Sequence, residues 1–162
     1  MHLHGNYETN IAEAYNLINS GKVESAITLF EKLTTNYPST AKGFHLKAFA
    51  YVKSNNLEKA HESIVKANKL MPNSLDISLD YSNILNSLGR KEEAFNILKV
   101  FDKDSTKDNR VFYNLGCICM DKSKHTDAVS YFKKTLALDP ENKNAAFNIG
   151  ISLFNDNKYK LS

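Results

Sequence analysis

The residues of this sequence that could do chemistry are few and widely separated. Cys117 and Cys119 are its two cysteines, and a shared metal ion would need both thiols on one side. Residues two apart on a helix point to different faces, so we interpret both thiols as structural. His2 and His4 could hold a metal only weakly, and we assign them to an N-terminal extension. The sequence therefore predicts no metal site and no cofactor.

The residues that could act as general acids or bases also form no expected catalytic site. Glu92-Glu93 and Lys133-Lys134 are interpreted as solvated helix faces, because general acids and bases must converge in a pocket. His61 and His125 fall near the starts of expected helices and are predicted to lie on the surface. The sequence contains no glycine-rich phosphate loop and no nucleophile or metalloprotease motif. No catalytic residue is therefore expected, unless a catalytic domain follows residue 162.

The composition indicates one helical domain of ordinary solubility. The 162 residues are 42% hydrophobic and 24% charged, and 21 basic against 18 acidic residues leave a net charge of only +3. This charge is too small for electrostatic nucleic-acid binding, and no apolar run is long enough to span a membrane. Two cysteines and no signal-peptide profile favour a reducing, cytoplasmic location. The abundance of Ala, Leu, Lys and Glu favours helices over strands.

The helices that would position these residues can be predicted from an internal repeat, which recurs every 34 residues. Four kinds of residue recur in phase. The columns are Ala26, Ala60, Ala94 and Ala128; Phe30, Ile64, Leu98 and Phe132; Pro38, Pro72 and Pro140; and the small residues Ala14, Ala48, Ser82, Gly116 and Gly150. Because small residues let helices approach and large ones fill the gaps, the columns predict a repeated helix–helix contact.

Each repeat is expected to hold two helices. Apolar residues recur at helical spacing on both sides of a turn, and a proline ends the second helix. The turns inside the repeats are assigned to Gly21, Asn55, Gly89, Ser123 and Asn157, residue types that tolerate tight or left-handed geometry. The third repeat ends in the polar, proline-free stretch 102–108, where we expect the loosest junction.

Residues 109–142 resemble a tetratricopeptide repeat in length and in pattern. Phe112, Leu115, Gly116, Cys119, Ala128, Phe132, Thr135 and Pro140 occupy the family's positions. The sequence departs from the family pattern in having no Trp, and in placing Lys47 where Leu is usual. The resemblance implies an all-α, right-handed solenoid covering 7–162. The expected parts are an extension at 1–6, repeats at 7–40, 41–74, 75–108 and 109–142, and a partial fifth repeat at 143–162.

The resemblance also implies where a ligand would bind. In this family the first helix of each repeat lines a concave groove that takes a peptide or a partner helix. The corresponding residues here are Tyr15, Lys42, His45, Phe49, Asp80, Asn83, Arg110, Tyr113, Asn114, Phe147 and Asn148. Ile11, Leu46 and Val52 could equally pack against neighbouring helices.

Some members of this family bind ligands in the groove with a clamp for a terminal carboxylate, and others with a ladder of asparagines. The clamp for a terminal carboxylate that some members carry is disfavoured, because Asp76 and Asp80 would repel the ligand. Asp80, Asn114 and Asn148 recur where glycosylating members carry an asparagine ladder, and amide side chains can grip a peptide main chain. Asn is also the family's common choice at that position.

The last helix is apolar around much of its circumference. We therefore expect either that the protein continues beyond Ser162 or that this helix mediates self-association. The sequence predicts a non-catalytic scaffold for protein–protein interaction, binding neither nucleic acid nor membrane. The alternative is the N-terminal recognition arm of a larger enzyme, such as a glycosyltransferase or sulfotransferase.

Overall fold

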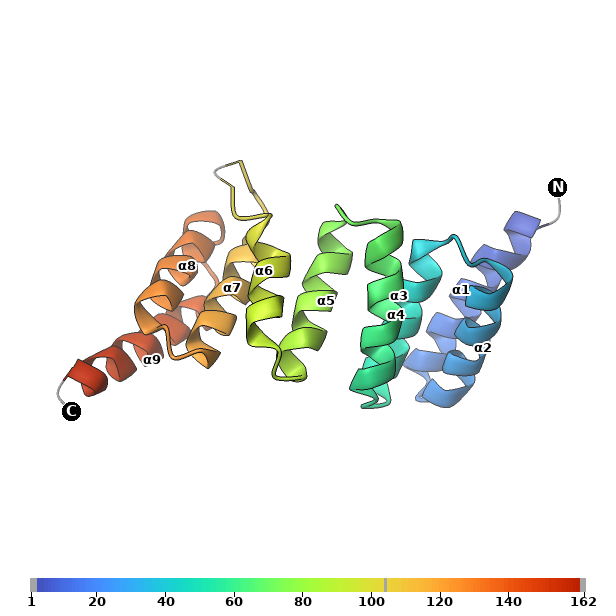
Figure 1. The fold of residues 1–162 in the computed structure, drawn as a ribbon, viewed down its shortest axis with the longest axis horizontal. Helices are drawn as coiled ribbons and strands as arrows, with labels where there is room; N and C mark the ends of the chain where they lie inside the picture. Colours follow the sequence, from blue (N-terminus) through green and yellow to red (C-terminus); the bar gives the residue numbers. More distant parts are fainter. Residues whose placement is uncertain (1–2, 104, 161–162) are drawn as a thin grey trace. The chain divides into compact units, whose positions relative to one another are not determined.

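The computed structural model describes residues 3–103 and 105–160, and the side chains of 7–103 and 105–157. Every regular element in this part of the chain is an α-helix, which confirms the expected fold class (Figure 1). The helices are α1 (Leu3–Asn19), α2 (Val23–Asn36), α3 (Ala41–Lys53), α4 (Leu57–Leu70), α5 (Leu75–Ser87), α6 (Lys91–Lys99), α7 (Asn109–Asp121), α8 (His125–Leu138) and α9 (Lys143–Lys160). None of these described helices is long and apolar enough to cross a bilayer.

Helices adjacent in the sequence pack against one another. The contacts divide the chain into two compact units, Met1–Ile84 and Leu85–Ser162. In the first unit α1 packs on α2, α2 on α3, and α3 on α4. In the second unit α6 packs on α7, α7 on α8, and α8 on α9. Each unit is thus a stack of helical hairpins with its own apolar interior.

The interiors of both units are built from the columns found in the sequence. The alanine column and the large apolar column are entirely inaccessible to solvent: Ala26, Ala60, Ala94, Ala128, Phe30, Ile64, Leu98 and Phe132 each have 0% exposure. Side chains that recur once in each repeat therefore occupy equivalent buried places. This result confirms the predicted repeated contact between helices.

The turns inside the hairpins share one backbone geometry. Gly21, Asn55, Gly89 and Ser123 have φ angles of 78°, 58°, 76° and 57°, in the left-handed region. The residue after each of them donates its N–H to the carbonyl five residues back, as Lys22 does to Leu17 at 2.8 Å. This hydrogen bond pairs a carbonyl that the helix end would leave unsatisfied. The sequence placed these four turns correctly.

The fifth expected turn is absent, because α9 runs without a break through Asn157. Gly150 also departs from its column, since its Cα is exposed and a Cβ built there would meet nothing within 4 Å. Gly116, one repeat earlier, lies against the ring of Phe132. The difference arises because no described helix packs against Gly150 as α8 packs against Gly116.

The junctions between hairpins follow the prolines. The helices α2, α4 and α8 end at Asn36, Leu70 and Leu138, two residues before Pro38, Pro72 and Pro140. A proline disfavours helical geometry in the residue before it, which explains the shared position. By contrast, α6 ends earlier in its repeat, at Lys99, and the polar stretch that follows has no proline.

Candidate functional site

In the first unit, residues expected to face a ligand bridge successive first helices. Lys42 of α3 donates from Nζ to Glu8 Oε2 of α1 at 2.8 Å. His45 Nε2 of α3 lies 2.6 Å from Asp80 Oδ2 of α5. The partners are 34 residues apart in the first pair and 35 in the second, so corresponding stretches of consecutive first helices lie side by side. The first helices of this unit therefore present one common face.

Apolar side chains on the same face differ in accessibility. Tyr15 is 41% and Val52 is 39% exposed, and both can contact a ligand. Phe49 is half-buried, with Lys53 Nζ 5.2 Å from its ring centroid. Ile11 and Leu46 are only 4% and 8% exposed, so they belong to the interior. The sequence left open whether these three residues face a ligand or pack against a neighbouring helix. Val52 is accessible to a ligand, whereas Ile11 and Leu46 pack in the interior.

In the second unit, the corresponding face is formed by α7 and α9. Asn148 of α9 lies within hydrogen-bonding reach of Tyr113 of α7, with Nδ2 and Oη 3.5 Å apart. Burial, with a smaller contribution from Cys117, raises the pKa of Tyr113 above its ordinary value, so its hydroxyl stays protonated. Asn114, which follows Tyr113 in the sequence, is half-buried, whereas Phe147 is 70% exposed. This face combines an accessible aromatic ring with hydrogen-bonding side chains.

The remaining candidate residues are Asn83 and Arg110. Asn83 is exposed on α5. Arg110 forms an ion pair with Asp108 at 2.7 Å, and that carboxylate also accepts from the Arg110 backbone N–H. Hydrogen bonds from Arg110 lower the pKa of Asp108. The Arg110 side chain is therefore tied to the start of its own helix.

The two cysteines and the possible metal ligands form no reactive arrangement within the part of the chain that the structure describes. Cys119 is 1% exposed, and burial raises its pKa to about 11. Burial likewise raises the pKa of Cys117, so both thiols are poor nucleophiles. Within the described residues, no three His, Cys, Asp or Glu side chains are grouped in a way that could hold a metal ion.

The expected surface position of His125 is wrong. Its side chain is 7% exposed at the first residue of α8. Proximity to a helix start indicated a solvated position, but the residue is buried in the folded structure. His61 is half-buried and lies 5.8 Å from Tyr81, measured between ring centroids.

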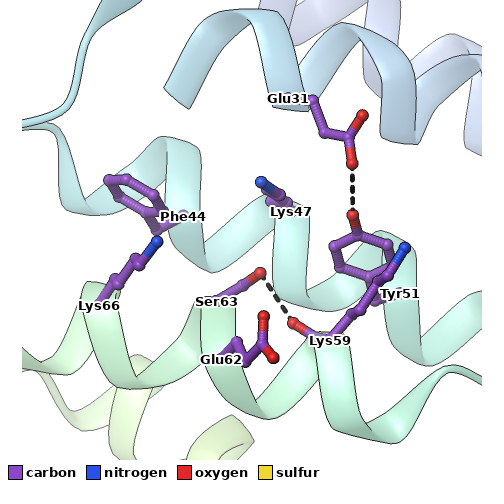
Figure 2. A pocket seen from close by; sticks show the side chains of 8 residues that line it. All are labelled: Glu31, Phe44, Lys47, Tyr51, Lys59, Glu62, Ser63 and Lys66. Atoms are coloured by element: carbon purple, nitrogen blue, oxygen red, sulfur yellow. Dashed lines mark hydrogen bonds between the residues drawn. The ribbon is translucent and has the colours of Figure 1, made fainter. Parts of the chain in front are cut away.

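A second candidate feature is a pocket of about 210 Å³ between α2, α3 and α4 in the first unit (Figure 2). It is lined by Glu31, Phe44, Lys47, Tyr51, Lys59, Glu62, Ser63 and Lys66. Tyr51 donates its hydroxyl to Glu31 Oε1 at 2.6 Å, and burial followed by this hydrogen bond raises the pKa of Tyr51. Burial lowers the pKa of Lys47. None of these eight residues belongs to the first-helix face described above.

Both the sequence and the fold of this chain are similar to those of known proteins. Two family models described as tetratricopeptide repeat match residues 10–40 and 110–142, inside the first and fourth expected repeats. No curated protein matches the sequence. The fold matches PilF of Pseudomonas aeruginosa with a TM-score of 0.82 and 24% identity, covering 94% of this chain and 70% of PilF.

The chain is a tetratricopeptide repeat protein. Two further solved tetratricopeptide repeat folds resemble it. MamA from Desulfovibrio magneticus RS-1 matches with a TM-score of 0.84 and 17% identity over 96% of this chain and 88% of MamA. YrrB, described as having an unusual peptide-binding site, matches with a TM-score of 0.73 and 20% identity over 88% of this chain and 74% of YrrB.

The tetratricopeptide repeat pattern predicted a first-helix face but gave no indication of the pocket. The one signal for the pocket in the sequence was Lys47, which occupies a position where the repeat usually has Leu. The other lysines of the pocket lie on the second helix of the hairpin, which the expected groove does not use. These lysines converge because of the way α2, α3 and α4 pack, and the spacing of the lysines in the sequence does not predict this packing.

Proposed function

We propose that this tetratricopeptide repeat protein is a non-catalytic scaffold whose first helices bind an extended peptide or a helix of a partner protein. The observation that carries the proposal is the contact between equivalent positions of successive first helices, as between Lys42 and Glu8. Such contacts align the first helices and give each unit a face on which a ligand can lie across more than one repeat.

The chemistry of this face suits a peptide. Tyr15 and Phe147 are accessible aromatic side chains, and aromatic anchors contribute strongly to protein interfaces. Asn114 and Asn148 can donate to and accept from a peptide backbone. On the first unit's face, Lys42 pairs with Glu8, and the His45 ring nitrogen lies within hydrogen-bond distance of Asp80. On the second unit's face, Phe147 and the two asparagines would recognise an apolar residue flanked by main-chain hydrogen bonds.

The test is partner capture by cross-linking, with the wild-type chain compared with variants on both kinds of helix. Phe49→Ala and Asn114→Ala should each weaken capture at least about fivefold, since a buried anchor or a main-chain hydrogen bond is worth roughly 1–2 kcal/mol. Thr28→Ala and Ser130→Ala, exposed on second helices, should capture partners as the wild type does. Circular dichroism melting shows whether the variants remain folded. Equal capture by all four variants would reject binding by the first helices.

We infer in addition that α9 supports self-association. Phe147, Leu153 and Phe154 are 70%, 50% and 70% exposed on this helix, an unusual concentration of accessible apolar surface. Light scattering over a range of concentrations should show a dimer that Phe154→Ser weakens. A wild-type chain that stays monomeric at high concentration would contradict this inference.

A further inference from the structure

The pocket between α2, α3 and α4 brings five charged side chains together. Lys47 of α3 and Lys59 and Lys66 of α4 share it with Glu31 and Glu62 (Figure 2). The three ammonium groups lie over aromatic rings: Lys47 and Lys59 are 5.9 and 5.6 Å from the Tyr51 centroid, and Lys66 is 5.6 Å from that of Phe44. The rings hold the cations in place from one side.

The ammonium groups of these lysines have hydrogen-bonding capacity left over. Within the described part of the chain, none of the three forms an ion pair with a carboxylate. Lys47 donates to the Thr34 hydroxyl at 3.5 Å, which is a long contact that uses one of its three hydrogens. The Glu31 carboxylate accepts from Tyr51 instead of from a lysine. The pocket therefore has several cationic donors facing open space.

A second cavity lies in the other unit, and most of its cationic side chains are paired within the fold. It is lined by Gly89, Arg90, Lys91, Glu92, Glu93, Lys122 and Lys124. There Lys122 pairs with Glu92 and Arg90 pairs with Glu93. Lys91 donates to the backbone carbonyl of Asp121. Three of its cations are satisfied within the fold, so this cavity has less to offer an anion.

We propose that the pocket of the first unit binds a carboxylate group, such as an acidic side chain of a partner protein. Three lysines against two glutamates leave one net positive charge, which a monoanion neutralises. A dianion would carry excess charge between Glu31 and Glu62 and would be repelled by them. A volume of about 210 Å³ equals about seven waters at about 30 Å³ each, which accommodates a carboxylate with its flanking methylenes. This site lies apart from the first-helix face and extends the proposed function with a second contact.

The experiment is an amide NMR titration of the isotope-labelled full chain at low ionic strength. The probes are acetate, acetyl-Gly-Glu-Gly-amide, its Gln counterpart and inorganic phosphate. The Glu peptide should cause saturable shifts at amides around Lys47, Tyr51 and Lys66, and the Gln peptide should not. Binding of the peptide more tightly than acetate assigns the pocket to side chains of proteins, and equal binding assigns it to small carboxylates. Both results support carboxylate recognition.

Matched variants decide whether the pocket is responsible. Lys47→Met and Lys66→Met should each weaken binding of the Glu peptide about tenfold, because each removes a charge-assisted hydrogen bond. Lys69→Met removes an exposed lysine of α4 outside the pocket and should bind as the wild type does. Because Lys66 is exposed, its variant keeps the test valid if Lys47→Met perturbs folding. Unchanged binding in Lys66→Met, equal shifts with the Gln peptide, or tighter binding of phosphate would overturn the proposal.

Discussion

At the scale of single residues, two glycines of the same repeat column occupy different surroundings. A Cβ on Gly116 would lie 2.6–2.9 Å from three ring atoms of Phe132, closer than side chains tolerate. A Cβ on Gly150 would meet nothing within 4 Å. The same residue type thus serves close packing at one position and is unconstrained by packing at the other.

Gly116→Ala should lower the free energy of unfolding by about 1–3 kcal/mol, because the added methyl group overpacks against the ring of a fully buried phenylalanine. Gly150→Ala should raise it by about 0.5–1 kcal/mol, since alanine restricts the unfolded chain and favours helix. Urea unfolding of both variants measures the difference. Equal effects of the two substitutions would show that the described contact with Phe132 is unimportant for stability.

At the scale of elements, the segment after α6 is fixed by one carboxylate. The Asp102 side chain is only 7% exposed and accepts from Lys99 and Lys134, each at 2.7 Å. The Tyr131 hydroxyl lies 3.1 Å from the same carboxylate. Asp102 thus ties the end of the shortest described helix to α8. The junction expected to be loosest is anchored at its first residue.

The stability of this anchor should depend on pH. Burial by itself would raise the pKa of Asp102, but hydrogen bonds from Lys134 and Lys99 outweigh burial and lower it. A carboxyl whose pKa is lower in the folded than in the unfolded chain stabilises the fold above its unfolded pKa of about 3.9. This stabilisation is lost as the pH falls through the lower, folded value.

Asp102→Asn should therefore cost about 1.5–3 kcal/mol at pH 7, the range for hydrogen bonds to charged groups. The difference from wild type should shrink as the pH falls below about 4. Urea unfolding at several pH values measures it. Glu141→Gln, an exposed carboxyl in the same unit, serves as the control and should change little at any pH. A cost for Asp102→Asn that persists unchanged at low pH would argue against the charge of Asp102 as its source.

At the scale of the whole molecule, the chain consists of two units with equivalent interiors. Phe30 in one and Phe132 in the other occupy the same repeat position, and both are entirely buried. In arrays of repeats, stability is close to a sum of contributions from each repeat and its neighbours. Damage to one interior should therefore act mainly on its own unit.

Phe132→Ala should cost about 3–5 kcal/mol, because it removes a buried ring and leaves a cavity. Amide hydrogen exchange should show lost protection across residues 85–160, with protection in α2, α3 and α4 largely retained. Phe30→Ala is the matched variant and should produce the reverse pattern. Uniform loss of protection along the described chain in both variants would indicate one cooperative unit.

Periodic features were predictable from the sequence because each repeat places the same residue type in the same local environment. The burial of Ala60 and Ile64 and the left-handed turns at Asn55 and Ser123 follow from equivalent positions in successive repeats. The burial of these columns could be predicted without knowing which distant residues are in contact. The same reasoning failed at Gly150 and Asn157, where the repeat is incomplete and the packing partner that defines the position is missing from the described helices.

The helical fold, the repeat and the buried columns could be predicted from the amino-acid sequence, because they depend on backbone propensity and periodic burial. The folded structure was needed to find that Asp102 pairs with two lysines, that His125 is buried, and that the lysines of α3 and α4 converge on one pocket. These features depend on non-periodic side chains brought together by packing between helices. Electrostatic and burial effects act through space, and their partners are not encoded at any fixed spacing along the chain.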